Sequence, residues 1–265
     1  MTNIHHIAQI LTQAGTDILL PAFQQHAQSQ TKSDGSIVTE ADVACQAFLQ
    51  NALSQLAPHI GFLGEEMSEE EQCACLNSDT SFWCVDPLDG TSNFATPMPL
   101  FAISVALMQH GHPILACIHD PIRQETYTAQ QGQGAYLNGQ RLTHPSNIQL
   151  QEAVGFLDFK RFEPALAQLF STQRIYRSQR NIGTCALEWA WLAAGRAQFL
   201  IHGAEKLWDY AAGSLLAAEA GHQISDFSGH PLFQNKVLSS SILAAPTSIH
   251  HQLKKHIQNN SNTTS

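Results

Sequence analysis

The sequence contains little charge and, above all, little positive charge. Only 13% of its 265 residues are charged, about half the share of a typical soluble protein. The 13 Lys and Arg residues are outnumbered by 22 Asp and Glu residues, so the formal net charge is -9. Binding to a nucleic-acid backbone or to an anionic membrane requires clustered Lys and Arg. We therefore expect neither nucleic acid nor a membrane as a partner.

Several other signals are missing. No apolar run reaches the length of about 18 residues that spans a bilayer, and the opening segment MTNIHHIAQI lacks the basic start and apolar core of a signal peptide. The cysteines form no pair of CxxC motifs, and the 14 histidines form no HExxH motif. We expect a cytoplasmic protein whose histidines mostly lie on the surface or in packing positions. We also expect its six cysteines to be free thiols: Cys45, Cys73, Cys75, Cys84, Cys117 and Cys185.

The charges are also distributed unevenly along the chain. Residues 33–122 contain 12 acidic residues and no Lys or Arg, whereas residues 123–206 contain nine basic and six acidic residues. Carboxylates that lie close together repel one another unless a cation balances them. Something other than a neighbouring Lys or Arg must therefore balance the acidic groups of the first segment.

The hydrophobic pattern predicts one compact unit. Apolar residues make up 43% of the chain, and no repeat or Pro/Ser-rich linker divides it. Apolar spacing predicts an opening helix that stops or kinks at Pro21 and a second helix that begins near Thr39. Consecutive strands without intervening helices then favour an antiparallel or mixed sheet. We place these strands at residues 60–63, 82–85, 101–108, 114–119, 125–129 and 134–137, with a hairpin turn at Asn138-Gly139.

After Arg141 strands and helices alternate. We expect strands at 153–157, near Ile175, at 198–201 and near Ile242, with helices from Glu163, over 184–194, over 209–220 and at the end. The fold class is therefore α/β with two lobes. An N-terminal α+β lobe would cover residues 1–140, a C-terminal α/β lobe residues 141–258, and a flexible tail residues 259–265.

The segment WCVDPLDGTSNF contains the densest group of chemically useful residues. Asp86 and Asp89 lie three residues apart where a predicted strand ends, and such carboxylates suit hard cations such as Mg2+. The backbone amides of Gly90 and Thr91 begin a short predicted helix, where an anion such as phosphate is favoured. Alternatively, Asp89 is only a turn residue or helix cap. The motif alone leaves both interpretations open.

Further carboxylates lie at other junctions between strands and helices. Glu65 and Glu66 follow a predicted strand, Asp42 forms a capping pattern with Thr39, and Asp209 precedes a helix rich in small residues. Each could be a cap or part of a solvated helix face, as we expect for Glu69–Glu71. Four such junctions in a chain with so little charge favour a shared site.

Four segments also match a known family in order and spacing. They are VTEAD at 38–42, GEE at 64–66, WCVDPLDGTSNF at 83–94 and LWDYAAGSLLAAEAG at 207–221, with supporting matches at 120–142 and 180–187. Over roughly residues 15–245 the chain resembles the inositol monophosphatase family of metal-dependent, lithium-sensitive phosphatases. The resemblance implies a layered αβαβα sandwich, a homodimer and a small phosphorylated metabolite as substrate.

The resemblance also implies a metal site with two or three Mg2+ ions and Li+ as a possible inhibitor. Glu65, Asp86 and the main-chain carbonyl of Leu88 match ligands of the first ion. Asp86, Asp89 and Asp209 match ligands of the second ion, and Glu65 also matches a ligand of a weaker third ion. These ions would balance the carboxylates of the segment that lacks cations.

The implied catalytic residues are Asp42, Thr91 and Glu65. Thr91 and Asp42 match a pair that orients and deprotonates the attacking water, while the amides of Gly90 and Thr91 match the phosphate cradle. Covalent catalysis by Cys84 is the weaker interpretation, because that segment has no basic neighbour to stabilise a thiolate.

Substrate recognition is less well defined. Gly183-Thr184 and the preceding Arg180 match family positions that line or support the active site, and Asp209 is a further candidate for substrate binding. His202 occupies a position where inositol-preferring members carry a Glu, and Lys206 also lies near the site. A His and a Lys suit an anion or a polar base better than sugar hydroxyls. The alternative for His202 is a strand-end residue with no role in binding a ligand.

We expect a Mg2+-dependent phosphomonoesterase that uses activated water, with inositol-1-monophosphate as the first candidate substrate. The alternatives are a nucleotidase acting on 3'-phosphoadenosine-5'-phosphate and a histidinol or sugar phosphatase. A different class is a metal-binding family member that binds protein or RNA-associated machinery without catalysis.

Overall fold

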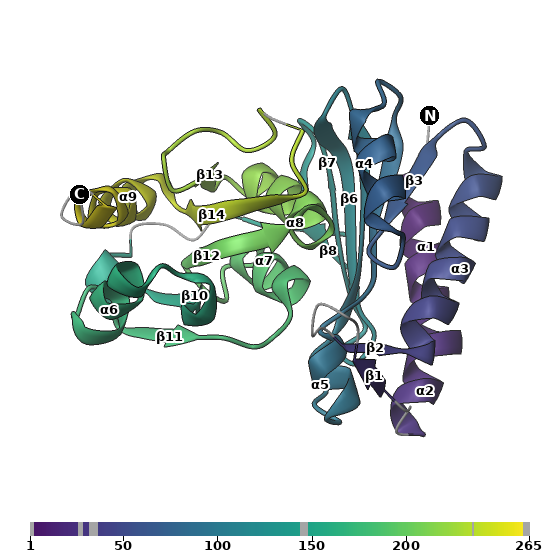
Figure 1. Ribbon diagram of the computed structural model, residues 1–265, viewed down its shortest axis with the longest axis horizontal. Coiled ribbons are helices and arrows are strands. Elements are labelled where there is room, and N and C mark those ends of the chain that lie inside the picture. Colours follow the sequence, from purple (N-terminus) through teal and green to yellow (C-terminus); the bar gives the residue numbers. More distant parts are fainter. Residues whose placement is uncertain (1–2, 26–28, 32–36, 144–147, 235, 262–265) are drawn as a thin grey trace.

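The computed structural model describes residues 3–25, 29–31, 37–143, 148–234 and 236–261, which form five layers (Figure 1). Helices α1 (Ile4–Ala14) and α3 (Glu40–Leu56) cover one face of a seven-stranded sheet. Helices α7 (Cys185–Ala193) and α8 (Leu207–Glu219) separate that sheet from a five-stranded sheet. Helices α6 (Pro164–Thr172) and α9 (Thr247–Ser261) form the outer layer. The predicted layered α/β sandwich is confirmed.

The central strand of the first sheet explains this layering. All residues of β4 (Phe82–Asp89) are buried, and neighbouring side chains point to opposite faces. Trp83 and Val85 pack in a cluster with the N-terminal helices, whereas Phe82 and Cys84 pack in a cluster with α7 and α8. The continuous apolar run therefore reflects a strand covered on both sides.

The second sheet follows the same rule. On β12 (Phe199–Lys206), Phe199 and Ile201 pack with residues of α6 and α9. Leu200 faces the other way and packs in the cluster that contains Trp189 of α7. Helices α7 and α8 are therefore covered by a sheet on each side, which explains why both are almost wholly apolar.

The strand order confirms a mixed sheet. The seven-stranded sheet pairs β3 with β4 in parallel and the remaining neighbours antiparallel. It contains, in order, β3 (Gly61–Gly64), β4, β5 (Ala102–Gln109), β6 (His112–Asp120), β7 (Glu125–Gln130), β8 (Gly134–Leu137) and β9 (Gln140–Arg141). The predicted turn joins the last two strands, with positive φ angles of 48° at Asn138 and 79° at Gly139.

The five-stranded sheet mixes parallel and antiparallel pairs. Its order is β11 (Ser178–Arg180), β10 (Val154–Asp158), β12, β14 (Ser239–Ala245) and β13 (Gln223–Ser225). The two sheets thus divide the chain between Arg141 and Val154, while the lobe boundaries themselves stay a prediction. Helix α9 extends to Ser261, into the predicted tail 259–265, and residues 262–265 lie outside the described part.

Shorter elements complete the fold. Strands β1 (Ser29–Thr31) and β2 (Ile37–Thr39) form a separate ribbon before α3. Helices α2 (Leu20–Gln24), α4 (Glu69–Asn77) and α5 (Thr91–Ala95) are short. Among the described residues, no helix is long and apolar enough to cross a membrane.

The structure corrects two local predictions, the stop of the opening helix at Pro21 and the strand near Ile175. The opening helix does not stop at Pro21 but passes through a π-helical turn (Gly15–Leu19) into α2, where Pro21 lies in the first turn. The N–H of Leu20 bonds to the carbonyl of Gly15, five residues back, so the hydrogen-bond register changes just before Pro21, which has no N–H of its own. The strand expected near Ile175 lies instead at β11, since Ile175 is buried in the preceding loop and its apolar character serves packing.

Candidate functional site

The site is built at the end of β4. Its pairing with β5 shifts between Asp86 and Asp89, and Oδ1 of Asp86 accepts the backbone N–H of Leu88 at 3.0 Å. Gly90 then ends the strand with a φ of 91°, and a Cβ there would lie 2.9 Å from the carbonyl oxygen of Leu100. This irregular backbone brings two carboxylates to one end of the sheet, and only glycine permits the turn that follows.

Three carboxylates meet at this point. Asp86, Asp89 and Asp209 each offer one oxygen, and these oxygens all lie within 4.8 Å of one another. Asp209 comes from the first turn of α8, where its Oδ2 accepts the backbone N–H of Lys206 at 3.0 Å. A donor set of carboxylate oxygens from separate elements fits a hard divalent cation such as Mg2+.

Electrostatics support the same conclusion. Burial raises the pKa of Asp86 well above its ordinary value, and the charges of Glu65, Asp89 and Asp209 raise it further. Burial and the charges of Asp89 and Glu65 raise the pKa of Asp209 in the same way. A cation bound between the two carboxylates would oppose this rise and favour their ionised forms.

Asp89 connects the two lobes. Its Oδ2 accepts the hydroxyl of Thr184 and the N–H of Ala186 at 2.7 Å, and its Oδ1 accepts the N–H of Cys185 at 3.2 Å. Burial raises the pKa of Asp89 to about 6, while these hydrogen bonds oppose the rise. Asp89 is therefore no cap of α5, because it lies at the N-terminus of α7, where negative charge is favoured.

Asp42 serves two purposes. Its Oδ2 accepts the N–H of Thr39 at 2.7 Å and the Thr39 hydroxyl at 2.5 Å, which completes the predicted capping pattern of α3. Its Oδ1 accepts the hydroxyl of Thr91 at 3.0 Å. The Thr91 hydroxyl also lies 3.0 Å from the carbonyl oxygen of Leu88. The carboxylate that caps α3 is therefore also hydrogen-bonded to the first residue of α5.

Glu65 lies just after β3, beside the cluster. Its backbone N–H donates to Val85 at 3.2 Å, and its carbonyl accepts from Gln72 at 3.1 Å, so the backbone is fixed on both sides. The charge of Glu65 acts on both Asp86 and Asp209. The next acidic run, Glu69–Glu71, is exposed at the start of α4, as expected of a solvated helix face.

Asn93 was not predicted from the sequence. Its amide nitrogen lies 2.9 Å from the carbonyl oxygen of Leu100 and 2.7 Å from that of Ile182, which is 89 residues away. Gly183, with a φ of 72°, packs against the same side chain. Asn93 thus positions the predicted substrate segment at 183–184, and its partners are too distant in sequence to give a local signal.

His202 and Glu205 lie on β12, beside the cluster. Nε2 of His202 is 3.4 Å from Oδ2 of Asp158, so the buried imidazole pairs with a carboxylate of the protein itself, and its role in binding a substrate remains a prediction. Glu205 is fully buried, and its Oε2 accepts the indole N–H of Trp189 at 2.8 Å. Glu205 was not predicted as a site residue, although an acidic residue within an apolar strand is a usable signal.

The remaining candidate groups are two exposed cationic side chains and one buried thiol. The Arg180 guanidinium donates to Ser178 and to the carbonyl of Gln179, both at 2.7 Å, and is exposed. Lys206 is exposed, with its ammonium 5.9 Å from the centre of the Trp208 ring. Burial raises the pKa of the Cys84 thiol well above its usual value, which argues against a nucleophilic thiolate.

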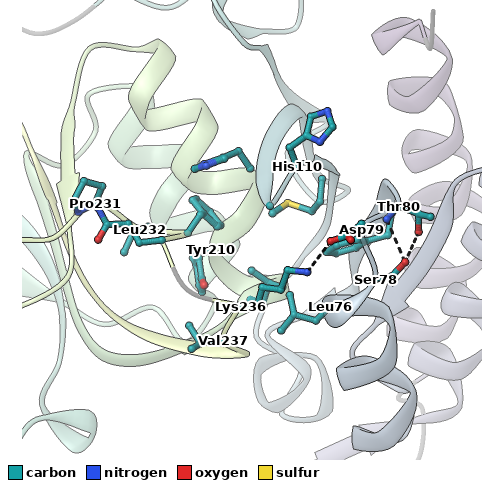
Figure 2. Close-up of a pocket in the computed structure, with 17 residues that line it drawn as sticks. Leu76, Ser78, Asp79, Thr80, His110, Tyr210, Pro231, Leu232, Lys236 and Val237 are labelled. Carbon is teal, nitrogen blue, oxygen red and sulfur yellow. Dashed lines mark hydrogen bonds and ion pairs between the residues drawn. The ribbon is translucent and has the colours of Figure 1, made fainter.

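A separate cavity of about 710 Å³ lies near the other end of β4 (Figure 2). Phe82, Tyr210 and Leu232 are among its lining residues, and Lys236 lies 3.3 Å from Asp79 across its edge. Phe82, at the start of β4, lines this cavity, whereas Asp89, in the carboxylate cluster, lies at the end of the same strand. The cavity and the carboxylates are therefore at opposite ends of β4. The carboxylate cluster is therefore the better candidate for chemistry.

Known proteins are similar to this chain in both sequence and fold. The family model described as the inositol monophosphatase family matches residues 1–262. The Nus factor SuhB of Escherichia coli strain K12 is 34% identical over 223 residues, covering 82% of this chain and 80% of the relative. The inositol-1-monophosphatase of Mesorhizobium japonicum is 34% identical over 240 residues, covering 88% and 87%. A solved IMPase structure from Thermotoga maritima has a TM-score of 0.86 at 28% identity and covers 100% of both chains.

Proposed function

This chain belongs to the inositol monophosphatase family, and we propose that it is a Mg2+-dependent phosphomonoesterase. The observation that carries the proposal is the convergence of carboxylate oxygens from Asp86, Asp89 and Asp209 within 4.8 Å. Inositol monophosphate is the first candidate substrate, because the relative from Mesorhizobium japonicum is an inositol-1-monophosphatase. A homodimer and a cytoplasmic location remain predictions.

Glu65 and the carbonyl of Leu88 would complete the ligands of two or three Mg2+ ions, together with the three aspartates. When bound, Mg2+ would supply positive charge to the phosphoryl and leaving oxygens and would lower the pKa of the attacking water. Li+ is expected to compete for the same oxygens.

Thr91 and Asp42 would prepare the water. Because the Thr91 hydroxyl donates to Asp42 at 3.0 Å, its lone pairs can accept a hydrogen bond from the water. Asp42, which is fully buried and held by Thr39 on its other oxygen, can then take the proton through that hydroxyl. No side chain has to form a covalent phosphoenzyme.

The phosphate would bind at the start of α5. Gly90 has no Cβ, so its backbone can approach a ligand closely, and the first amides of the helix are free to donate to phosphoryl oxygens. The alcohol part of the ester would then extend toward Gly183, Thr184 and His202. The imidazole of His202, backed by Asp158, suits a polar or anionic group on the alcohol.

A second candidate is a binding function without catalysis. It is favoured by the similarity to a protein named Nus factor SuhB, which covers 82% of this chain. The weakness of this candidate is that all the carboxylates proposed as metal ligands are present. The low content of Lys and Arg also gives little basic surface for nucleic acid.

A panel of phosphate esters in the presence of Mg2+ separates these functions. We expect phosphate release from inositol-1-monophosphate or from another member of the panel, with Asp209→Asn as the inactive control. The panel should include 3'-phosphoadenosine-5'-phosphate, histidinol phosphate and sugar phosphates. Release from none of them by the folded, metal-loaded protein would favour the binding function.

A further inference from the structure

Three side chains of different chemistry converge beside the aspartates. Cys185 begins α7, whereas His202 and Glu205 lie on β12. One possible ligand atom from each lies within 4.8 Å of the other two: the thiol sulfur, an imidazole nitrogen and a carboxylate oxygen. Carboxylates alone suit Mg2+, but this combination of sulfur, nitrogen and oxygen does not.

The backbone of β12 is shaped to bring two of these groups together. Residues three positions apart in a regular strand face opposite sides of the sheet. The pairing of β12 with β14 shifts between His202 and Glu205, and this bulge allows both side chains to reach the same point. Gly203 within the bulge is necessary, because a Cβ there would overlap the carbonyl oxygen of Arg161.

Glu205 supplies an independent sign of a missing cation. The residue is fully buried, and only its Oε2 has a partner, the indole N–H of Trp189 at 2.8 Å. Its Oε1 is buried without a hydrogen-bond partner among the described residues. A buried carboxylate oxygen is costly to leave unsatisfied, and a cation beside it removes that cost.

His202 is oriented as a metal-binding histidine would be. Its Nε2 lies 3.4 Å from Oδ2 of Asp158, on the neighbouring strand β10. Histidines that bind a metal commonly direct their second nitrogen to such a carboxylate. The other nitrogen, Nδ1, accepts the N–H of Ala204 at 3.2 Å, a bond that an ion would replace.

We propose that Cys185, His202 and Glu205 bind one Zn2+ ion. Sulfur, nitrogen and oxygen ligands together are typical of zinc, and three protein ligands leave a fourth position for water or a ligand. Cys185 is partly exposed, which gives the ion a path from solvent. The zinc would lie next to Asp89, whose Oδ1 accepts the N–H of Cys185 at 3.2 Å. With zinc bound, both nitrogens of His202 would be occupied, so a polar group of a substrate would meet the open position of the zinc in place of the imidazole. Zinc binding itself does not depend on the proposed phosphatase function.

Co2+ is a suitable probe, because a thiolate ligand gives it a charge-transfer absorption that oxygen ligands alone do not give. The whole chain is titrated with Co2+ in excess Mg2+ and a reductant that contains no thiol. We expect one equivalent of Co2+ to develop the band and Zn2+ to abolish it. Cys185→Ala should lose the band, whereas Cys73→Ala on α4 and Asp86→Asn should keep it. Circular dichroism establishes that each variant is folded.

Zinc affinity, measured by competition with a chromophoric chelator, tests the other ligands. Glu205→Gln and His202→Gln should each weaken zinc binding at least tenfold, and Asp158→Asn should weaken it about 10–100-fold. The proposal is wrong if the wild type shows no thiolate band or if Cys185→Ala keeps it. Unchanged zinc affinity in both Glu205→Gln and His202→Gln, or displacement of zinc by excess Mg2+, would also contradict it.

Discussion

The hydroxyl of Thr91 donates to Oδ1 of Asp42 at 3.0 Å, although the two residues are 49 positions apart. The other oxygen of Asp42 holds the start of α3 through Thr39. The capping pattern and the proposed water-activating pair therefore share one carboxylate. A residue that fixes a helix terminus is held more rigidly than a free side chain, which suits a group that must position a proton acceptor.

Thr91→Ala should lower turnover by about 10²–10⁴-fold, the range typical of a lost acid–base group. Its effect on Mg2+ affinity should be small, because the proposed carboxylate ligands remain. Thr91→Ser keeps the hydroxyl and should retain most of the activity. Turnover and Mg2+ affinity are measured on the same preparations, and an equal loss in both would argue against the proposed role of Thr91.

Asp86→Asn should have opposite effects on stability with and without Mg2+. Without metal, the substitution removes a buried charge that Glu65, Asp89 and Asp209 repel, and should raise the free energy of unfolding by about 1–3 kcal/mol. With Mg2+, the variant should lose the stabilisation that the ion gives the wild type. Unfolding by denaturant, measured once in chelator and once in Mg2+, tests both effects on stability. Glu70→Gln, on the exposed face of α4, is the control. Equal Mg2+ stabilisation of wild type and Asp86→Asn would contradict the ligand assignment.

His119 should make the protein less stable in acid. The imidazole is buried, and burial lowers its pKa to about 4 from the ordinary value of 6.5. Protonation therefore favours the unfolded chain. The neutral His119 imidazole leaves the folded protein at its full stability above pH 6.5, and the free energy of unfolding decreases as the pH falls toward 4.

His119→Gln removes this titration. The difference in unfolding free energy between wild type and variant should shift by up to roughly 3 kcal/mol between pH 6.5 and pH 4. Unfolding is measured in urea at both pH values, and exposed His5→Gln is the control. A difference that does not change with pH would show that His119 has no such effect.

Asn93→Ala should weaken the contact between the lobes. The change leaves the carbonyl oxygens of Leu100 and Ile182 without their donor, at an expected cost of about 1–3 kcal/mol. Asn77→Ala, which removes an exposed bond to Cys73 within α4, should cost less than about 0.5 kcal/mol. Thermal unfolding compares the two, and similar losses would mean that the hydrogen bonds of Asn93 add little to the contact between the lobes.

Local sequence patterns predicted most of the elements. The apolar spacing placed α3, α6 and α7 and the strands of the first sheet, because burial imposes the periods of 3.6 and 2 on the sequence. The π-helical turn before Pro21 escaped prediction, because the register of backbone hydrogen bonds leaves no mark on apolar spacing. The ligand sets came from family motifs, and their roles remain predictions.

Long-range geometry accounts for what the sequence did not reveal. Glu205 meets His202 only because a bulge shifts the pairing of β12, and a bulge has no reliable local signal. Asn93 reaches carbonyl groups that come near it only when the lobes pack. In both cases the contact depends on how separate strands and helices pack together, which the local sequence does not encode.

The central claim is that the clustered aspartates bind the metal on which phosphate ester hydrolysis depends. The most direct test measures phosphate release from inositol-1-monophosphate as Mg2+ is added to chelator-treated protein. We predict no release without metal, a rise with Mg2+ in the wild type and no rise in Asp86→Asn. Hydrolysis that proceeds in chelator, or a full response to Mg2+ in Asp86→Asn, would contradict this account.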